Sequence, residues 1–379
     1  MQEEEDLISQ LPDGILLLIL DKIDIYEAVK TSMILWKNLW RSLPGLRFHF
    51  RPATTPFRIH LQDFTIHSTF VSQLLSHRDA AAAVHDFHLL FDGPTPVPQF
   101  PCGVDREFLE ECVLYAINHG VQSIRLHWPT YRKLRLPPAF LTCNTLRELE
   151  IRDLFCPVKL PGRLSLPYLK TLHLHTIVLV FANDHHRMDP FSALPELEKL
   201  TLTSFVCDGL VVIKAPKLRL LEIENYYLNM EEISAPLLTS FTYKCLAAWE
   251  CAKVNLPILE QVYLDIDQVF NTNCLTMLHQ FGNASAVSLT SNTLQILQRE
   301  FGFSDQTPIP FPNMKCLKVM KGRYTSLIVC PSVINYLTRT LNCEVELSPN
   351  LFDIEHMTDE EMYDYQNSLK QLVHQYNAT

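Results

Sequence analysis

The stretch LPYLKTLHL, residues 166–174, carries the pattern that decides the fold. Its spacing of one proline and three apolar residues recurs at near-constant intervals, in LPELEKLTL (194–202), APKLRLLEI (215–223), APLLTSFTY (235–243) and LPILEQVYL (256–264). Successive prolines of the five copies are 28, 21, 20 and 21 residues apart. A period of about 20–29 residues with this pattern is typical of leucine-rich repeats.

Weaker copies extend the array on both sides: HGVQSIRL (119–126), NTLRELEI (144–151), GNASAVSL (282–289), FPNMKCLKV (311–319) and, as an outlying strand, HDFHLL (85–90). Each copy places alternate apolar residues on one face of a short strand, which cannot bury that face alone. Parallel stacking of the strands builds a continuous core. We therefore predict an α/β protein, with an irregular leucine-rich-repeat solenoid and a parallel concave sheet. The alternative is that these are separate strands of an ordinary α/β domain.

Polar residues alternate with the buried positions and are expected to line the concave face of the sheet. The charged and aromatic members are Arg125, His127, Glu148, Glu150, Arg152, His173, His175, Lys199, Glu222, Glu224, Lys244, Tyr263 and Asp265. A polar face of mixed charge suits a protein or peptide ligand better than an apolar small molecule. The alternative is a solvated face that binds nothing.

Charge and hydropathy narrow the range of partners. The 379 residues carry a net charge of −10 without a long Lys/Arg run, which disfavours nucleic acid as a partner. Mean hydropathy is +0.03, and the apolar run from Ile15 to Leu20 is too short to span a membrane. Because acidic residues precede that run, we expect no secretory signal. The eleven cysteines form no CxxC pair, so we expect reduced thiols and a cytoplasmic or nuclear location.

Residues that carry chemistry are sparse. No GxSxG, HExxH, GxxxxGK[ST] or GxGxxG motif occurs in the chain. The adjacent His185 and His186 lack spaced further ligands and are expected in a solvated loop. Cys245 and Cys251 have no matching second pair and are expected to pack in the core. We therefore expect neither an enzyme nor a bound metal or cofactor.

Ahead of the repeats, LPDGILLLILDKIDIYEAVKTSMILWKNLW (11–40) has helical spacing. Asp13 is expected to cap the first helix, and Trp36 and Trp40 are expected on one helix face at i, i+4. A unit of about 45 residues is marginally stable alone and gains stability by docking on another protein. The alternative is an N-terminal cap of the solenoid, which repeat arrays require.

These residues also carry a resemblance. DLISQLPDGILLLIL (6–20), EAVKTS (27–32) and LWRSLPGLRF (39–48) resemble the F-box of plant F-box/leucine-rich-repeat proteins, including FBD-type relatives. The resemblance continues through residues 104–151 and implies a three-helix F-box ahead of the solenoid. It implies that the F-box binds a SKP-type adaptor of a cullin-based SCF ubiquitin ligase, while the repeats recruit a target protein. The positions implied for adaptor binding and helix packing are Leu11, Pro12, Ile15, Leu16, Ile19, Leu20, Ala28, Val29 and Trp36.

The expected layout has four parts: an F-box (5–50), a connecting segment (51–103), the solenoid (104–347), and a C-terminal loop with an amphipathic helix (348–379). Thr358 and Glu361 match a capping box at the start of that helix, roughly residues 358–376. TSMILWKNLW (31–40) is two residues shorter than the family pattern, and on a helix such a deletion rotates the later side chains by roughly 200°. A second hypothesis is therefore a repeat-based binding module whose F-box no longer engages the adaptor.

Overall fold

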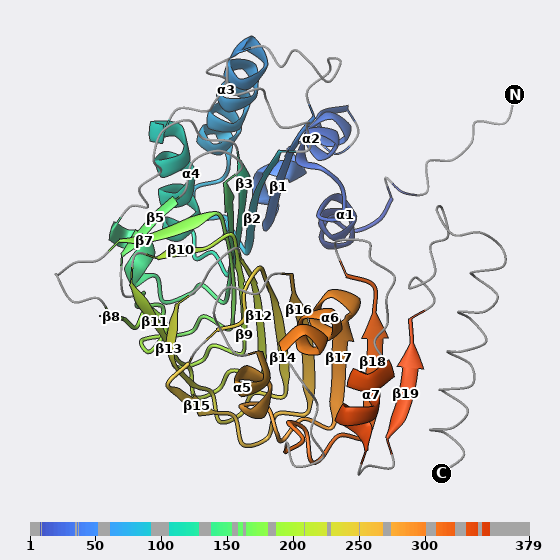
Figure 1. The fold of residues 1–379 in the computed structure, drawn as a ribbon. Helices are drawn as coiled ribbons and strands as arrows, with labels where there is room; N and C mark the ends of the chain where they lie inside the picture. Colours follow the sequence, from blue (N-terminus) through green and yellow to red (C-terminus); the bar gives the residue numbers. More distant parts are fainter. Residues whose placement is uncertain are drawn as a thin grey trace, which may run out of the picture. The chain divides into compact units, whose positions relative to one another are not determined.

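The structure is a computed structural model of the chain, coloured along the sequence in Figure 1. It describes residues 8, 10–34, 36, 38–51, 61–91, 106–128, 138–153, 158–161, 164–180, 187–207, 209–225, 229–249, 251–267, 274–300, 308–322, 331–339 and 343–348. The chain divides into two compact units. Unit 1 comprises Met1–Ala182 and Ala193–Glu196, and unit 2 comprises Asn183–Ser192 and Leu197–Thr379.

Unit 1 begins with three short helical elements, α1 (Asp13–Leu20), α2 (Ile25–Ile34) and the 3₁₀ helix η1 (Leu39–Ser42). Both α1 and α2 pack against η1. The prediction that Asp13 caps α1 is wrong: Pro12 is the N-cap residue, and no side chain caps the helix. Pro12 is extended, and its carbonyl accepts hydrogen bonds from the Ile15 and Leu16 amides, so the backbone alone starts the helix.

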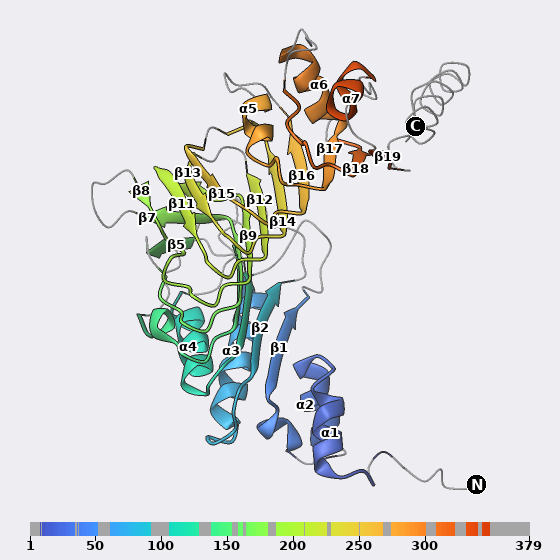
Figure 2. The ribbon, with the colours of Figure 1, turned by 90° about the horizontal axis from the view of Figure 1, so that it is seen from below.

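The sheet of unit 1 has five parallel strands in sequence order: β1 (Gly45–Phe50), β2 (Asp86–Phe91), β3 (Ser123–Trp128), β4 (Glu148–Asp153) and β6 (Thr171–His175). Strand β1 is the edge strand, with α1 and α2 beside it (Figures 1 and 2). The connections contain α3 (Leu61–His77), α4 (Arg106–Asn118) and η2 (Pro138–Thr142), and α4 packs on both α3 and η2. A separate parallel pair joins β5 (Val158–Pro161) to β7 (Ile177–Val180).

A buried arginine fixes the turn between α3 and β2. The Arg78 guanidinium donates hydrogen bonds to the Leu43 carbonyl at 2.7 Å, to the Tyr115 hydroxyl at 3.1 Å and to the Ala83 carbonyl at 3.4 Å. Burial lowers the pKa of Arg78, and the charge of the Tyr115 phenol opposes this effect. The side chain thereby links the segments that precede β1, β2 and β3. It also provides a hydrogen-bond donor to the Leu43 and Ala83 carbonyls, which lie outside the strands.

The main sheet of unit 2 has seven parallel strands in sequence order: β9 (Lys199–Thr203), β12 (Leu220–Asn225), β14 (Ser240–Cys245), β16 (Gln261–Ile266), β17 (Ala286–Thr290), β18 (Cys316–Met320) and β19 (Glu344–Leu347). A second parallel sheet contains β8 (Arg187–Met188), β11 (Leu210–Lys214), β13 (Met230–Ser234) and β15 (Lys253–Asn255). The remaining elements are β10 (Val206–Cys207), α5 (Cys274–His279), α6 (Ser291–Glu300) and α7 (Pro331–Thr338). Extended segments thus connect the early strands of this unit, and helices connect the later ones.

The proline motif is explained by the turn that it forms before each strand. In three successive repeats the leucine amide two residues after proline donates to the carbonyl before proline: Leu218 to Ala215, Leu238 to Ala235 and Leu259 to Leu256, at 3.2, 3.0 and 3.4 Å. Proline suits the second position of such a turn because its φ is fixed and no N–H is needed there. The spacing P-x-L therefore sets both the turn and the first inward side chain.

The fold prediction is confirmed, with additions at both ends. Every strand that the repeats predicted is present, including β2 at the outlying HDFHLL, and the apolar positions face inward. The structure adds β1, β19 and α3, which the sequence did not reveal. Residues 45–50 pair with β2 and belong to the sheet, so the stretch predicted as the F-box (5–50) includes one strand after its helical elements. The predicted helix at 358–376 lies outside the described residues.

Candidate binding surfaces

The first candidate surface is the apolar side of α1. Large apolar side chains are exposed there: Leu18 by 62%, Ile15 by 44% and Ile19 by 40%. Leu11 and Ile8, on the approach to the helix, are exposed by 36% and 53%. Exposed single apolar residues are ordinary, but several on one short helix indicate a surface that another protein covers.

The structure divides the residues implied for adaptor contact. Leu11, Pro12, Ile15 and Ile19 are exposed, whereas Leu16 and Leu20 are buried with 3% and 1% exposure and pack within unit 1. Leu16 and Leu20 thus contribute to the packing of unit 1, and the predicted adaptor contact rests on the exposed members of the set. Leu18, which the resemblance did not include, is the most exposed large apolar residue of the helix. Ala28 is fully buried, in keeping with its packing role, and Val29 and Trp36 are half-buried.

The third helical element is a single turn. Helix α2 ends at Ile34, Asn38 has a left-handed φ of 70°, and η1 begins at Leu39. The prediction that Trp36 and Trp40 share one helix face is therefore wrong, since a left-handed residue separates them. Trp40 is buried with 7% exposure. The shortened TSMILWKNLW segment thus places the buried Trp40 on η1 and forms a 3₁₀ turn in place of a third α-helix.

A close approach joins these helical elements to the sheet. Arg47 on β1 donates a hydrogen bond to the Asp21 carbonyl at the end of α1, and its guanidinium also lies 3.6 Å from the Asp21 carboxylate. A Cβ atom at Gly45 would collide with that carboxylate, so a larger residue at the start of β1 would displace the Asp21 side chain. Arg47 therefore links the first strand directly to the end of the first helix.

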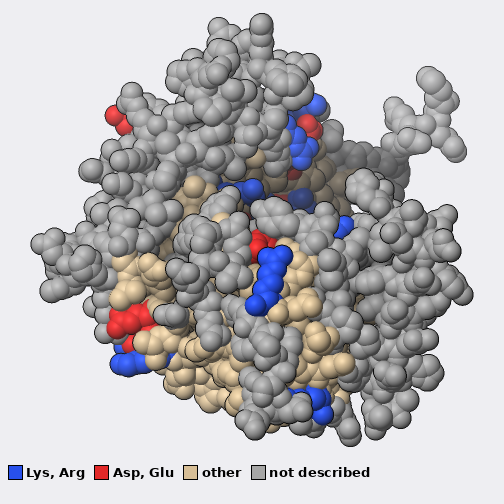
Figure 3. All heavy atoms as spheres, in the orientation of Figure 1, with Lys and Arg blue, Asp and Glu red and all other residues tan. Residues whose placement is uncertain are grey.

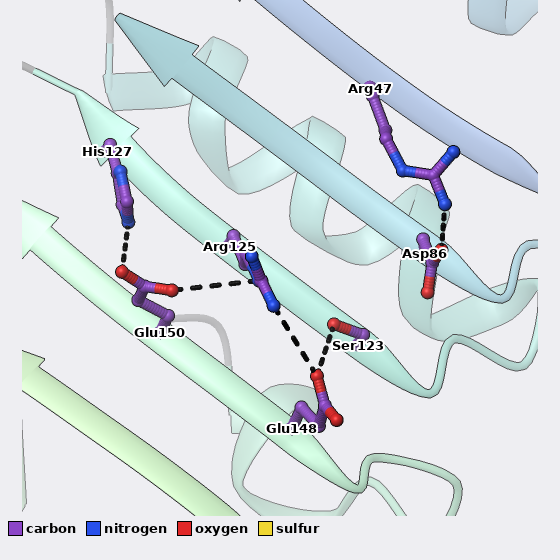
Figure 4. A network of polar contacts seen from close by, with 7 residues as sticks. All are labelled: Arg47, Asp86, Ser123, Arg125, His127, Glu148 and Glu150. Carbon is purple, nitrogen blue, oxygen red and sulfur yellow. Dashed lines mark hydrogen bonds and ion pairs between the residues drawn. The ribbon is translucent and has the colours of Figure 1, made fainter. Parts of the chain in front are cut away.

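The second candidate surface is the polar face of the unit 1 sheet, where charged side chains meet across the strands (Figure 4). His127 on β3 donates to Glu150 on β4 at 2.6 Å. Arg125 lies 3.6 Å from the Glu150 carboxylate and 3.8 Å from that of Glu148, which also accepts a hydrogen bond from Ser123 at 3.3 Å. Three neighbouring side chains therefore share two carboxylates.

This network changes the ionisation of Glu150. The hydrogen bond from His127 lowers the pKa of Glu150, and the charges of His127, Arg125 and His173 act in the same direction against partial burial. Glu148 and Arg152 are exposed, and His173 and His175 are half-buried. Arg125, His127, Glu148, Glu150, Arg152, His173 and His175 thus share one face of the sheet, as predicted from the repeat register.

The third candidate surface is the polar face of the unit 2 sheet. Glu222 accepts a hydrogen bond from Thr201 at 3.1 Å, and Lys244 lies 3.9 Å from Glu224 and over the Tyr263 ring at 5.7 Å. Lys199 is half-buried at the start of β9. Lys318 and Glu346 form an ion pair at 2.8 Å further along the sheet. In the view of Figure 3, the described Lys, Arg, Asp and Glu residues occur in small mixed groups.

One predicted member of this face is not accessible. Asp265 has 4% exposure and accepts a hydrogen bond from Thr290 at 2.8 Å. Helix α6 follows directly after Thr290 and packs against β16, which carries Asp265. The expectation that Asp265 contacts a ligand is therefore wrong: the register placed it correctly, but the start of α6 covers it.

The described residues contain no group of three or more His, Cys, Asp or Glu side chains placed to hold a metal ion. His185 and His186 lie outside the described ranges. Cys245 and Cys251 are free and buried, which agrees with the packing role predicted for them. Burial raises the pKa of the Cys251 thiol, and the hydrogen bond it donates to the Lys253 carbonyl accompanies that burial. The Cys251 thiol is thereby kept protonated.

Comparison with known proteins places these surfaces in a family context. No protein-family model matches the chain. F-box/LRR-repeat protein 13 of Arabidopsis thaliana is 25% identical over 92% of this chain and 76% of its own length. The chain is similar to plant F-box/LRR-repeat proteins. An F-box/FBD/LRR-repeat protein of the same plant is 26% identical over 83% of this chain and 72% of its own length. A further F-box/LRR-repeat protein is 29% identical over 55% of the chain and 56% of its own length.

The LRR-repeat names of these relatives agree with the series of parallel repeat strands in the structure. In the described ranges, no helix is both long and apolar enough to cross a membrane.

Proposed function

We propose that this protein is the substrate-recruiting subunit of an SCF-type ubiquitin ligase. The apolar side of α1 docks on a SKP-type adaptor, which links the chain to a cullin, and the polar faces of the repeats bind the target protein. The protein itself performs no catalytic step. The similarity to F-box/LRR-repeat proteins over most of the chain supports this assignment.

The observation that carries the proposal is the exposed row on α1. Ile15, Leu18 and Ile19 leave a short helix with its apolar side open, although Leu16 and Leu20 already fill the core below it. Fully burying one such side chain contributes about 1.5–3 kcal/mol. A partner that covers this row therefore gains enough free energy to form a specific complex.

Co-purification with a purified SKP-type adaptor tests the proposal. We expect the unaltered chain to retain the adaptor, and Leu18→Glu or Ile15→Glu to weaken the association at least tenfold, because a charge would replace a buried contact. Ile66→Glu is the matched control, since Ile66 is 69% exposed on α3 of the same unit. Failure of the unaltered chain to bind the adaptor contradicts the proposal, as does equal binding by all four proteins.

A second candidate function is protein binding by the repeats without adaptor contact. The single 3₁₀ turn of η1, where the family pattern has a longer helix, favours this alternative. It predicts that the unaltered chain fails to bind the adaptor and that inserting two residues at Leu35 restores binding. If the insertion has no effect and the unaltered chain binds, the second candidate is excluded.

A further inference from the structure

Two cross-strand rows on the sheet of unit 1 have an unusual composition. The first row joins Arg47, His88, Arg125, Glu150 and His173, and the second joins His49, Leu90, His127, Arg152 and His175. These ten residues, which we call the histidine–arginine face, contain three arginines, five histidines and a single carboxylate. A face so rich in hydrogen-bond donors complements an acidic ligand.

Internal pairing occupies part of this set, since Arg47 forms an ion pair with Asp86 and His127 pairs with Glu150, but it leaves capacity on Arg125 and Arg152. Glu150 is the one carboxylate of the two rows, and it already accepts from His127 while Arg125 approaches it at 3.6 Å. Arg125 keeps 46% of its side chain exposed, and its two ion pairs are long. In the described part of the chain, the exposed Arg152 has no ion-pair or hydrogen-bond partner. Both guanidinium groups can therefore turn to a ligand without leaving a buried charge behind.

His88 adds a second, independent feature to this face, an unsatisfied polar side chain. It is only 8% exposed, and its Nε2 atom is buried without a hydrogen-bond partner among the described residues. In register, His88 lies between Arg47 on β1 and Arg125 on β3. Burial and these two arginines lower its pKa to about 4, while Asp86 and Glu150 act in the opposite direction. The two guanidinium groups beside His88 are donors that an acceptor oxygen would satisfy, and the His88 ring can donate to the same oxygen when Nε2 carries the proton.

We propose that the histidine–arginine face binds a short carboxylate-rich segment of the recruited protein. This inference rests on the proposed function, in which the repeats hold the target, and it specifies the chemistry of that target. Five strands at a spacing of about 4.8 Å span about 19 Å, which an extended segment of about six residues covers. Asp86 and Glu148, in the row just before these two, favour a ligand of limited charge over a nucleic-acid backbone.

Fluorescence anisotropy with the full chain tests this proposal. The probes are two labelled hexapeptides, EDEDEE and its neutral counterpart QNQNQQ, at low ionic strength. We expect the acidic peptide to bind at least tenfold more tightly than the neutral one. Arg152→Gln should weaken binding of the acidic peptide several-fold, because guanidinium pairing with carboxylate is lost. Lys318→Gln, on the polar face of unit 2, is the matched control and should leave binding unchanged.

Arg152 is exposed, so its substitution leaves the fold intact, and a thermal unfolding curve confirms this. Arg125→Gln is the second variant and should weaken binding by at least as much as Arg152→Gln. Equal binding of the two peptides overturns the proposal, as does loss of binding with Lys318→Gln alone. Tighter binding of an oligo-dT hexamer than of the acidic peptide also overturns it. Adaptor co-purification is independent of these substitutions, so failure here leaves the proposed function standing.

Discussion

The polar faces of the two units are built on the same backbone pattern and yet differ in chemistry. In both, inward leucines alternate with outward polar residues along parallel strands. The unit 1 face gathers arginines and histidines, whereas the unit 2 face carries threonines and glutamates with scattered lysines. The repeat therefore fixes the core and leaves every second position open to a binding function. Substitutions in both units can test whether the cores are equivalent and the faces are not.

The largest effect is expected from opening the core of either unit. Phe87 in unit 1 and Phe241 in unit 2 are fully buried. The ring centroids of Phe87 and Phe48 are 5.9 Å apart, and those of Phe241 and Phe281 are 5.1 Å apart. Each substitution to alanine should cost about 3–5 kcal/mol in the free energy of unfolding, because buried contacts are lost and a cavity remains. Urea unfolding measures this cost, with the exposed Ile66→Ala as the control. A cost below about 1 kcal/mol in one unit alone would show that the cores are not equivalent.

The second effect is a loss of stability in acid that originates in unit 1. His67 and His88 are buried, and burial lowers the pKa of each to about 4. The unfolded histidines titrate near 6.5, so the unfolded state binds more protons between these values. Stability is therefore complete above about pH 6.5 and falls by a few kcal/mol as the pH drops toward 4. Urea unfolding at pH 7.5, 6.0 and 5.0 measures this loss.

The contribution of one of these groups can be isolated by substitution. His88→Gln should make stability less dependent on pH in that range, whereas substitution of the exposed His77 by glutamine should leave the dependence as it is. An unchanged pH profile in His88→Gln would show that this histidine is not responsible. His88 would then not contribute to a difference in acid stability between the two units.

A smaller effect is expected at the buried carboxylate of unit 2. Asp265→Ala removes the acceptor of the Thr290 hydroxyl in a site that α6 covers. Leaving a buried donor unsatisfied costs about 1–3 kcal/mol. The free energy of unfolding measures this loss, and Asp265→Asn should restore part of it because the amide oxygen still accepts. If Asp265→Ala has wild-type stability, Asp265 does not hold α6 on the sheet.

The smallest effect is expected from an exposed ion pair of the same unit. Glu346→Gln removes the 2.8 Å contact to Lys318, in which the two side chains are 51% and 35% exposed. Surface pairs of this kind contribute about 0.5 kcal/mol or less. Thermal unfolding at low and high salt measures the change. A loss above about 1 kcal/mol would show that charge pairing stabilises the unit 2 sheet more than its exposure indicates.

The sequence predicted the repeat strands well because proline and leucine recur at a fixed spacing there. It did not reveal β1, because GLRFHF lacks the proline turn and follows the helical motif without a break. On α1, residues 15–20 are all apolar, so helical spacing alone could not tell the buried Leu16 and Leu20 from the exposed Leu18. Packing against η1, which is not contained in the local pattern, covers one side of the helix.

Register also predicts where a side chain points but not what lies over it. Asp265 and Glu224 hold corresponding positions on β16 and β12, and α6 buries only the former. Similarly, the sequence places His88 on the outer face, but its burial is a property of the assembled unit. Contacts between segments distant in the chain therefore set accessibility, and the local pattern does not contain them.

The edge position of β1 has a practical consequence for deletion experiments. Removing the chain through residue 50, where the predicted F-box ends, would remove Phe48 from its contact with Phe87 and leave one edge of β2 unpaired. Open strand edges promote association between molecules, so such a truncated protein is expected to aggregate. A cut after Ser42 would remove α1, α2 and η1 while keeping β1 in place. Loss of an interaction after the longer deletion would otherwise be mistaken for loss of the binding surface itself.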